Sequence, residues 1–306
     1  MASEGKFARA WDSDLAYSFR GSPVSMVAAA LTLICLLGAL FAPWLAPQDP
    51  FDSASLNLSN AFIPPVWLAD GRAAYVLGSD NQGRDMLSTI LYGGRLSLAV
   101  SLAAVALALV LGVALGLVSG FLGGRTDAFI MRVADVQLSF PAILVALLID
   151  GVARVAMPRD SHDALAIPVL IVAIALSGWV QYARTVRGST LVEKNKEYVQ
   201  AARVIGRGPL AIMLRHVLPN ALGPVLVIAT IHIATAIITE ATLSFLGIGV
   251  PVTQPSLGTL IRVGNDFLFS GEWWITVFPG VALVLFVLSV NLLGDWLRDA
   301  LNPKLR

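Results

Sequence analysis

Charged side chains are scarce in this chain of 306 residues. Asp, Glu, Lys and Arg together make up 13% of the sequence, against about 25% in an average soluble domain. Hydrophobic residues reach 57%, and the mean hydropathy is +0.76. A soluble protein of this size needs far more polar surface. The composition therefore excludes a soluble globular enzyme and a disordered chain, and it predicts an all-α protein that crosses a membrane several times.

Residues that could carry catalysis or hold a metal are also few. One cysteine and three histidines cannot form an intrachain disulfide and do not supply a metal-binding cluster. The sequence has no G-x-x-x-x-G-K-[S/T] run to cradle ATP phosphates and no G-x-S-x-G run to present a nucleophile. A net charge of +1 gives no sign of nucleic-acid binding. We therefore expect no catalytic residue, no metal and no cofactor bound by this chain, and we do not expect an enzyme.

Six apolar segments are each near the ~20 residues that cross a bilayer as a helix. They are residues 24–46, 96–119, 129–149, 164–183, 217–246 and 273–293. The third is the weakest, because Arg132, Asp135 and Gln137 fall in its first two turns. The sequence thus predicts six transmembrane helices.

Basic residues predict the orientation, since cytoplasmic loops of membrane proteins are rich in Lys and Arg. If the N-terminus is cytoplasmic, most of the 21 Lys and Arg residues lie on the inner side, and residues 184–216 hold the largest group. An even number of spans returns the C-terminus to the same side. Trp44 and Trp273 then lie at outer ends, and Trp179 and Trp296 at inner ends, as is typical of interfacial anchors. We expect both termini in the cytoplasm.

These spans divide the chain into four parts. Residues 1–23 form a cytoplasmic N-terminal segment, and residues 24–95 hold the first span and a long, proline-containing outer loop. Residues 96–294 contain five spans and the inner loop 184–216, and residues 295–306 form a cytoplasmic tail. Loops longer than about 12–15 residues are usually functional or disordered, so the inner loop is a candidate functional segment.

A short amphipathic helix is expected inside this inner loop. Tyr198, Ala201, Ala202 and Ile205 follow the spacing of one helical face, and Gly206 then breaks the pattern. From the periodicity, two interpretations remain open. The helix either rests on the membrane interface or presents small side chains for close docking of a soluble partner.

The same loop resembles a known signature. Gln200-Ala201-Ala202, then Gly206, then the ending Leu218-Pro219 is similar to the EAA motif of permease subunits of bacterial ABC importers. The match departs at Gln200, where the family has Glu. By this resemblance the segment couples the permease to its ATPase, and the coupling residues are Glu197, Gln200, Ala201, Ala202, Gly206, Arg207, Leu218 and Pro219.

Further segments resemble one branch of that family, the "C"-type permeases of dipeptide, oligopeptide and nickel transporters. The outer-loop run 77–85 (LGSDNQGRD), the run 240–249 (EATLSFLGIG) and the tail beginning GDWLRD at 294 carry this resemblance. Leu257 departs from it, since many relatives have Trp there. The resemblance covers residues 22–306.

What the resemblance implies is a type I importer permease in a bacterial inner membrane, with a core of five spans behind an N-terminal helix and outer loop. Its expected partners are a second, homologous permease subunit, two ATP-binding subunits that hold ATP and Mg, and a periplasmic or lipid-anchored solute-binding protein, all in membrane lipid and without nucleic acid. The cargo would be di- or oligopeptides, with nickel or glutathione as alternatives. A secondary transporter that works without ATPase subunits is the rival from another class, and a membrane-embedded enzyme is a further one.

Other residues of the spans have two interpretations each. Gly112, Gly116 and Gly120 recur every four residues, which is typical of close helix packing and also compatible with a hinge. His232 and Glu240 are ionisable groups in the fifth span, which are costly in a membrane and often functional. His232 is a candidate for lining the path or for a satisfied packing contact. Glu240 is a candidate for a structural or gating hydrogen bond, or for a residue at the outer boundary of the membrane. Asp135 is expected to pair with Arg132, one turn earlier.

Overall fold

The computed structural model describes residues 14–52, 56–158, 162–251 and 253–301. Within these ranges the regular secondary structure is helical, and one antiparallel bridge joins Ser79 to Asp85. The chain divides into two compact units. The first contains the described residues up to Arg95 and those from Val263 onward, and the second is Leu96–Arg262.

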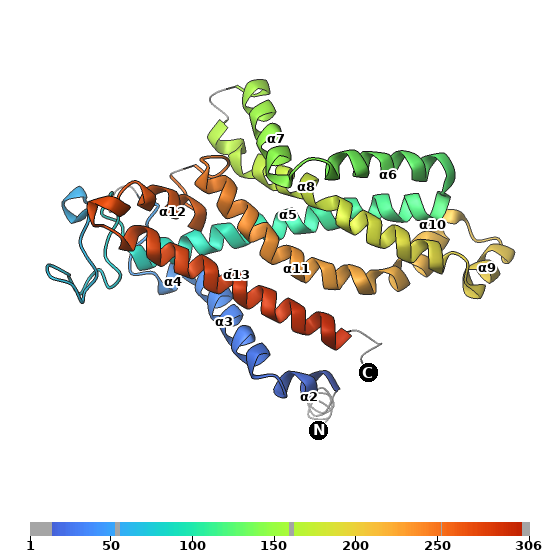
Figure 1. The fold of residues 1–306 in the computed structure, drawn as a ribbon, viewed down its shortest axis with the longest axis horizontal. Coiled ribbons are helices and arrows are strands. Elements are labelled where there is room, and N and C mark those ends of the chain that lie inside the picture. Colours follow the sequence, from blue (N-terminus) through green and yellow to red (C-terminus); the bar gives the residue numbers. More distant parts are fainter. Residues whose placement is uncertain (1–13, 53–55, 159–161, 252, 302–306) are drawn as a thin grey trace. The chain divides into compact units, whose positions relative to one another are not determined.

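In the first unit, two long apolar helices pack along each other (Figure 1). They are α3 (Pro23–Leu40) and α13 (Trp274–Leu301). The start of α3 follows from its sequence, because the Ser22 side chain accepts the N–H of Ser25 and proline suits the first helical position. The smaller elements of this unit are α2 (Asp14–Arg20), α4 (Ala42–Leu45), η1 (Leu58–Asn60) and η4 (Leu268–Ser270).

The second unit is built around α8, which packs against α7 on one side and α11 on another. Its elements are α6 (Gly124–Leu138), α7 (Ala142–Ala156), α8 (His162–Glu193), α9 (Glu197–Val204), α10 (Pro209–Ile212), the π-helical turn η3 (Met213–Val217) and α11 (Leu218–Phe245). Two helices pass from one unit into the other, α5 (Met86–Leu122) and α12 (Leu257–Asn265). One buried apolar cluster draws residues from α5, α8, α9 and α11, so α9 is anchored to these long helices.

Five of the described helices are long and apolar enough to cross a membrane, and a bent pair brings the number to six if it counts as one span. The bent pair is α6 and α7, whose axes turn by 96°. The single helix expected over residues 129–149 is therefore wrong in shape. Pro141 explains the break, because proline lacks an N–H and disfavours helical geometry in the preceding residue.

Three helices are longer than the hydrophobic pattern indicates. α5 begins at Met86 rather than at Leu96, α8 continues to Glu193 rather than ending near Ala183, and α13 continues to Leu301 rather than ending near Leu293. The extra turns of α8 still bury Val186 and Thr190, so packing holds the helix beyond the apolar stretch. The inner loop expected from residue 184 thus begins only after Glu193.

Part of the predicted charge pattern lies outside the described residues. This applies to most of the N-terminal segment 1–23, to the end of the tail 295–306, and to the basic residues Lys6, Arg9, Arg159, Lys304 and Arg306.

Candidate functional site

The motif-bearing loop forms the short helix α9 and a sharp turn after it. Gly206 has a φ of +83°, a left-handed conformation that favours glycine. The N–H of Arg207 donates to the Ala202 carbonyl at 3.0 Å, and the N–H of Gly206 donates to the Arg203 carbonyl at 2.9 Å. These bonds close the helix as a glycine C-cap. No atom lies within 4 Å of the position of a Cβ at Gly206, so backbone conformation, not contact, requires glycine here.

The face of α9 that packs inward differs from the expected one. Val199 and Ala202 are buried among Ile212, Met213 and Val217. Of the predicted face, only Ala202 is buried, while the other three members, Tyr198, Ala201 and Ile205, are exposed. The physical reason is that α9 carries apolar residues on more than one side, Val199 and Val204 beside Tyr198 and Ala202, and the neighbouring helices select the side that is buried.

The opposite face of α9 and the turn after it are exposed and partly apolar. Val204 is 87% exposed, Ile205 77% and Leu210 66%. Glu197, Gln200, Ala201 and Arg207 are exposed as well. Gln200 makes a local contact, because its Nε2 donates to the Asn195 carbonyl at 3.1 Å. The remaining motif residues, Leu218 and Pro219, open α11.

A polar junction ties the start of α9 to its neighbours. The Tyr198 hydroxyl donates to Glu193 Oε2 at 2.5 Å, and Asn220 Nδ2 donates to that hydroxyl at 3.3 Å. Lys196 Nζ donates to the other carboxylate oxygen of Glu193 at 2.7 Å. Partial burial, together with the bond to Glu193, raises the pKa of Tyr198 to about 12. The hydroxyl therefore stays protonated and keeps donating at neutral pH.

A hollow of about 570 Å³ lies between α8 and α11, with Ala142 at its edge. Its polar lining is Ser177, Gln181, Arg184, Thr185, His232, Thr235 and Thr239. Both helices are long enough to cross a membrane, where exposed polar side chains are unusual unless they face a cavity or a partner. This placement makes the hollow a candidate for part of a solute path.

His232 sits in the wall of this hollow and also joins the two helices. Its Nδ1 lies 2.9 Å from the Tyr182 hydroxyl, and the imidazole covers Gly178 of α8. The two interpretations of His232, lining a cavity and making a packing contact, therefore describe the same side chain.

Glu240 is placed differently, since it does not line the hollow. Its side chain is fully buried, and Oε1 accepts a hydrogen bond from Ser244 at 2.7 Å. Ser97 of α5 and Ser256 also lie against the carboxyl group. Ser97 in turn accepts the N–H of Leu257 at 3.3 Å, so this buried group of hydroxyls joins α5, α11 and the start of α12.

The glycine series of α5 lies against α8. A Cβ at Gly112 would come within 2.5 Å of Tyr182, one at Gly116 within 2.9 Å of Val186, and one at Gly120 within 2.7 Å of Thr190. Real Cβ atoms do not come so close, so the absence of side chains lets α5 and α8 approach.

Ion pairs fix α6 against α8. Asp127 binds Arg187 through two hydrogen bonds of 2.5 and 2.6 Å and also accepts one from Ser119. Asp135 pairs with Arg184 at 2.5 Å, so the expected pairing with Arg132 is wrong. Arg187 lies 60 residues from Asp127 in the sequence, and Arg184 lies 49 residues from Asp135. Helical spacing gives no signal for pairs so far apart.

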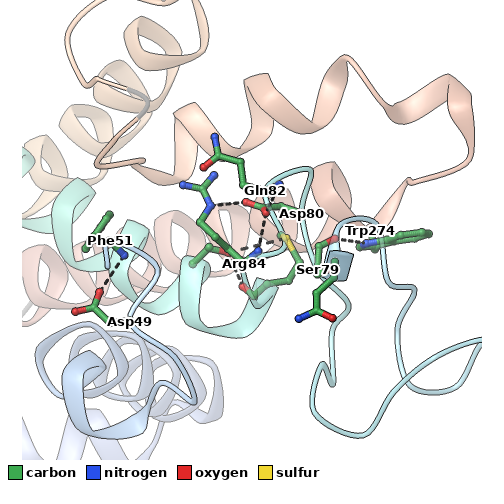
Figure 2. A network of polar contacts seen from close by, with 10 residues as sticks. Asp49, Phe51, Ser79, Asp80, Gln82, Arg84 and Trp274 are labelled. Atoms are coloured by element: carbon green, nitrogen blue, oxygen red, sulfur yellow. Dashed lines mark hydrogen bonds and ion pairs between the residues drawn. The ribbon is translucent and has the colours of Figure 1, made fainter. Parts of the chain in front are cut away.

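The outer-loop motif forms a compact hydrogen-bonded turn at the start of α5, shown in Figure 2. Asp80 Oδ1 accepts the N–H groups of Gln82 and Arg84, and its Oδ2 pairs with Arg84 Nε at 2.6 Å. Trp274 Nε1 donates to the Ser79 carbonyl at 3.0 Å. The hydrogen bond from Trp274 thus connects this turn to the first turn of α13 within the first unit.

The described residues contain no group of three or more His, Cys, Asp or Glu side chains placed to hold a metal ion. Two other features of these residues are candidates for a functional role. An exposed helix is anchored to long apolar helices, and a polar hollow lies between two of those helices.

Comparison with known proteins places the chain among transport proteins. Residues 112–306 match the family described as "binding-protein-dependent transport system inner membrane component", and residues 9–65 match the "N-terminal TM domain of oligopeptide transport permease C". The dipeptide transport system permease protein DppC of Escherichia coli K12 is 41% identical over 288 residues, or 94% of this chain and 91% of the relative. The di/tripeptide permease DppC of Pseudomonas aeruginosa is 37% identical over 274 residues, or 90% and 86%.

A solved structure has a related fold. It is described as inward facing conformations of the MetNI methionine ABC transporter, and it matches with a TM-score of 0.54 at 19% identity, covering 71% of this chain and 98% of that chain. At this identity the likeness concerns the fold alone. With one family spanning most of the chain and relatives above 30% identity along nearly all of it, the chain belongs to the inner-membrane components of binding-protein-dependent transport systems, the permease subunits of ABC importers.

Proposed function

We propose that this permease subunit imports di- or oligopeptides and forms half of the path across a bacterial inner membrane. The names of its relatives in Escherichia coli and Pseudomonas aeruginosa support peptide cargo. In the proposed complex a homologous permease forms the other half, two ATP-binding subunits carry ATP and Mg, and a periplasmic or lipid-anchored binding protein delivers the solute. This chain binds no cofactor of its own, and both termini face the cytoplasm.

The observation that carries the coupling role is the two-sided environment of α9. Its inner face, Val199 and Ala202, is buried against the long helices, while Val204 and Ile205 on the other face are exposed. α9 is outside the segments long enough to span the membrane. An exposed apolar end on an anchored helix is suited to bind a groove of an ATP-binding subunit, because helix-in-groove recognition buries the apolar face of a helix in a hydrophobic groove.

The hollow between α8 and α11 is the proposed surface of the path. Its polar side chains, among them Gln181 and Thr235, lie on helices of spanning length. In the complex, the second permease faces this surface and completes the path. His232 holds α8 and α11 together at its wall, while Glu240 secures the far end of α11 away from the solute.

The proposed mechanism is alternating access. Closure of the ATP-binding subunits pushes on α9, and α8 and α11 shift between discrete packed arrangements that open the path to one side at a time. The hydrolysis energy comes from the partners, and this chain converts movement at α9 into movement at the hollow.

The test uses Ala201→Arg in the complex purified from its own membranes. Ala201 is exposed on α9, so a bulky charge there obstructs docking and leaves the fold intact. The matched control is Ala69→Arg, at an exposed position of the loop before α5. We expect the α9 variant to insert normally but lose the ATP-binding subunits and uptake, and the control to keep both. Uptake that persists in Ala201→Arg contradicts the assignment of α9. Gly206→Asp should act similarly by straining the turn.

A further inference from the structure

One hydroxyl group, that of Tyr198, lies where three elements of the second unit meet. It donates to Glu193, the last residue of α8, and Asn220 in the first turn of α11 donates to it. Asn220 Nδ2 also donates to the carbonyl of His216 in η3 at 2.8 Å. The phenol therefore links α9 at once to the helix before it and to the helix after it.

The link to α11 crosses an irregular stretch of backbone. η3 is a π-helical turn, in which the N–H of Leu218 donates to the Met213 carbonyl. Pro219 follows and has no N–H to donate, so the regular ladder cannot continue through this point. Helices often kink at π-helical turns and at proline, and π-helical turns frequently occur at functional sites. Without a brace, a push on α9 would be absorbed at η3 rather than passed into α11.

The connection to α8 is much more direct. Only residues 194–196 separate the two helices, and Lys194 Nζ donates to the Gly120 carbonyl at 2.6 Å, which ties this turn to α5. On the other side, α9 reaches α11 only through Ile205–Gly208, α10 and η3. The buried contacts of α9, Val199 and Ala202, are apolar and without fixed direction.

We propose that Tyr198, held between Glu193 and Asn220, is the positioning residue that carries the movement of α9 across the π-helical turn into α11. The inference rests on the proposed role of α9 as the docking helix. Glu193 is well suited to orient the phenol, because its second oxygen is already occupied by Lys196. The hydroxyl is thus fixed by a charged acceptor on one side and an amide donor on the other.

The experiment compares Tyr198→Phe with Tyr17→Phe in the assembled complex in proteoliposomes. Tyr198→Phe removes the hydroxyl and keeps the ring. Tyr17 is 80% exposed on α2, so its variant removes a hydroxyl outside the junction. Dipeptide uptake and ATP hydrolysis are measured on the same vesicles. We expect Tyr198→Phe to keep assembly and ATP hydrolysis and to lose only the small part of thermal stability that one hydrogen bond contributes, but to move less peptide per ATP than the wild type and Tyr17→Phe.

A second pair of variants separates this role from general support of the fold. In Glu193→Gln the amide oxygen can still accept a hydrogen bond from the phenol, whereas Glu193→Ala leaves that hydroxyl only the longer contact of 3.4 Å to the His216 carbonyl. Coupling should therefore be retained in the first and lost in the second. A peptide-to-ATP ratio in Tyr198→Phe equal to that of the wild type overturns the inference. If the wild-type complex itself shows no ATP-dependent uptake, the proposed function fails instead.

Discussion

The Tyr182 hydroxyl lies 2.9 Å from Nδ1 of His232 and joins α8 to α11 at the wall of the polar hollow. Tyr182 is fully buried, so the hydrogen bond satisfies a hydroxyl that would otherwise be costly inside the protein. The same imidazole covers Gly178. The distance between the two helices is therefore set by one histidine lying on one glycine.

This contact predicts a specific pair of effects. In Gly178→Ala the new Cβ would overlap the imidazole of His232, and overpacking of this kind typically costs about 1–3 kcal/mol. We expect a lower midpoint of thermal unfolding and reduced uptake. His232→Ala in the same chain creates room, so the double variant should recover part of the lost stability. Equal destabilisation in the single and double variants would show that the two residues are not in contact.

The buried carboxyl group of Glu240 predicts a difference between two substitutions. Glu240→Gln keeps a side chain of the same size that can accept from Ser244 and the other hydroxyls, and it should be tolerated. Glu240→Ala leaves a cavity and unpaired hydroxyls, and it should lower the free energy of unfolding by about 2–5 kcal/mol. Thermal unfolding of the purified subunit in detergent checks this. If Glu240→Gln is as damaging as the alanine variant, an amide does not replace the carboxyl group and the hydrogen bonds from the hydroxyls do not explain its role.

The pair formed by Asp127 and Arg187 gives a third prediction. Arg187→Ala removes two hydrogen bonds and leaves a half-buried carboxylate without its partner, so α6 should loosen from α8. The matched control is Arg125→Ala, an exposed arginine in the same helix as Asp127. We expect faster proteolysis of the α6 segment in the first variant than in the control. Equal rates would indicate that the pair does not hold α6.

The junction at Tyr198 predicts how coupling depends on pH. Because the folded-state pKa of Tyr198 is raised to about 12 from near 10 in an unfolded chain, the contribution of the neutral phenol is complete below about pH 10 and is lost only as the pH rises through the folded value. The difference in peptide per ATP between the wild type and Tyr198→Phe should thus stay constant from about pH 6 to 9. A difference that falls within this range would place another titrating group in the junction.

The sequence was sufficient for the approximate positions of five spans, because uninterrupted apolar runs are a strong signal. Pro141 interrupts the third segment, but the 96° turn between α6 and α7 depends on how both helices pack. The motif located α9 and Gly206, whereas periodicity chose the wrong face. Val199 is buried because it packs in one cluster with Ile212 and Met213, and the tertiary fold determines these contacts.

Contacts between residues far apart in the chain could not be predicted from the sequence. Asp135 had a nearby arginine at helical spacing, yet it binds Arg184 of α8. Tyr182, Gly178 and Asn220 are ordinary residues of apolar or loop segments, and only the packing of α8 against α11 gives them a role. Local patterns report which side of a helix is apolar, but not which helix will meet it.

The most direct test of the central claim is uptake of a labelled dipeptide by proteoliposomes containing this chain, copurified with whatever subunits accompany it. We expect a second permease and ATP-binding subunits to copurify, and uptake to require ATP and the solute-binding protein. Competition by unlabelled peptides, but not by nickel or glutathione, would fit the proposed cargo. Uptake by this chain alone, without ATP, would contradict the account and indicate a secondary transporter.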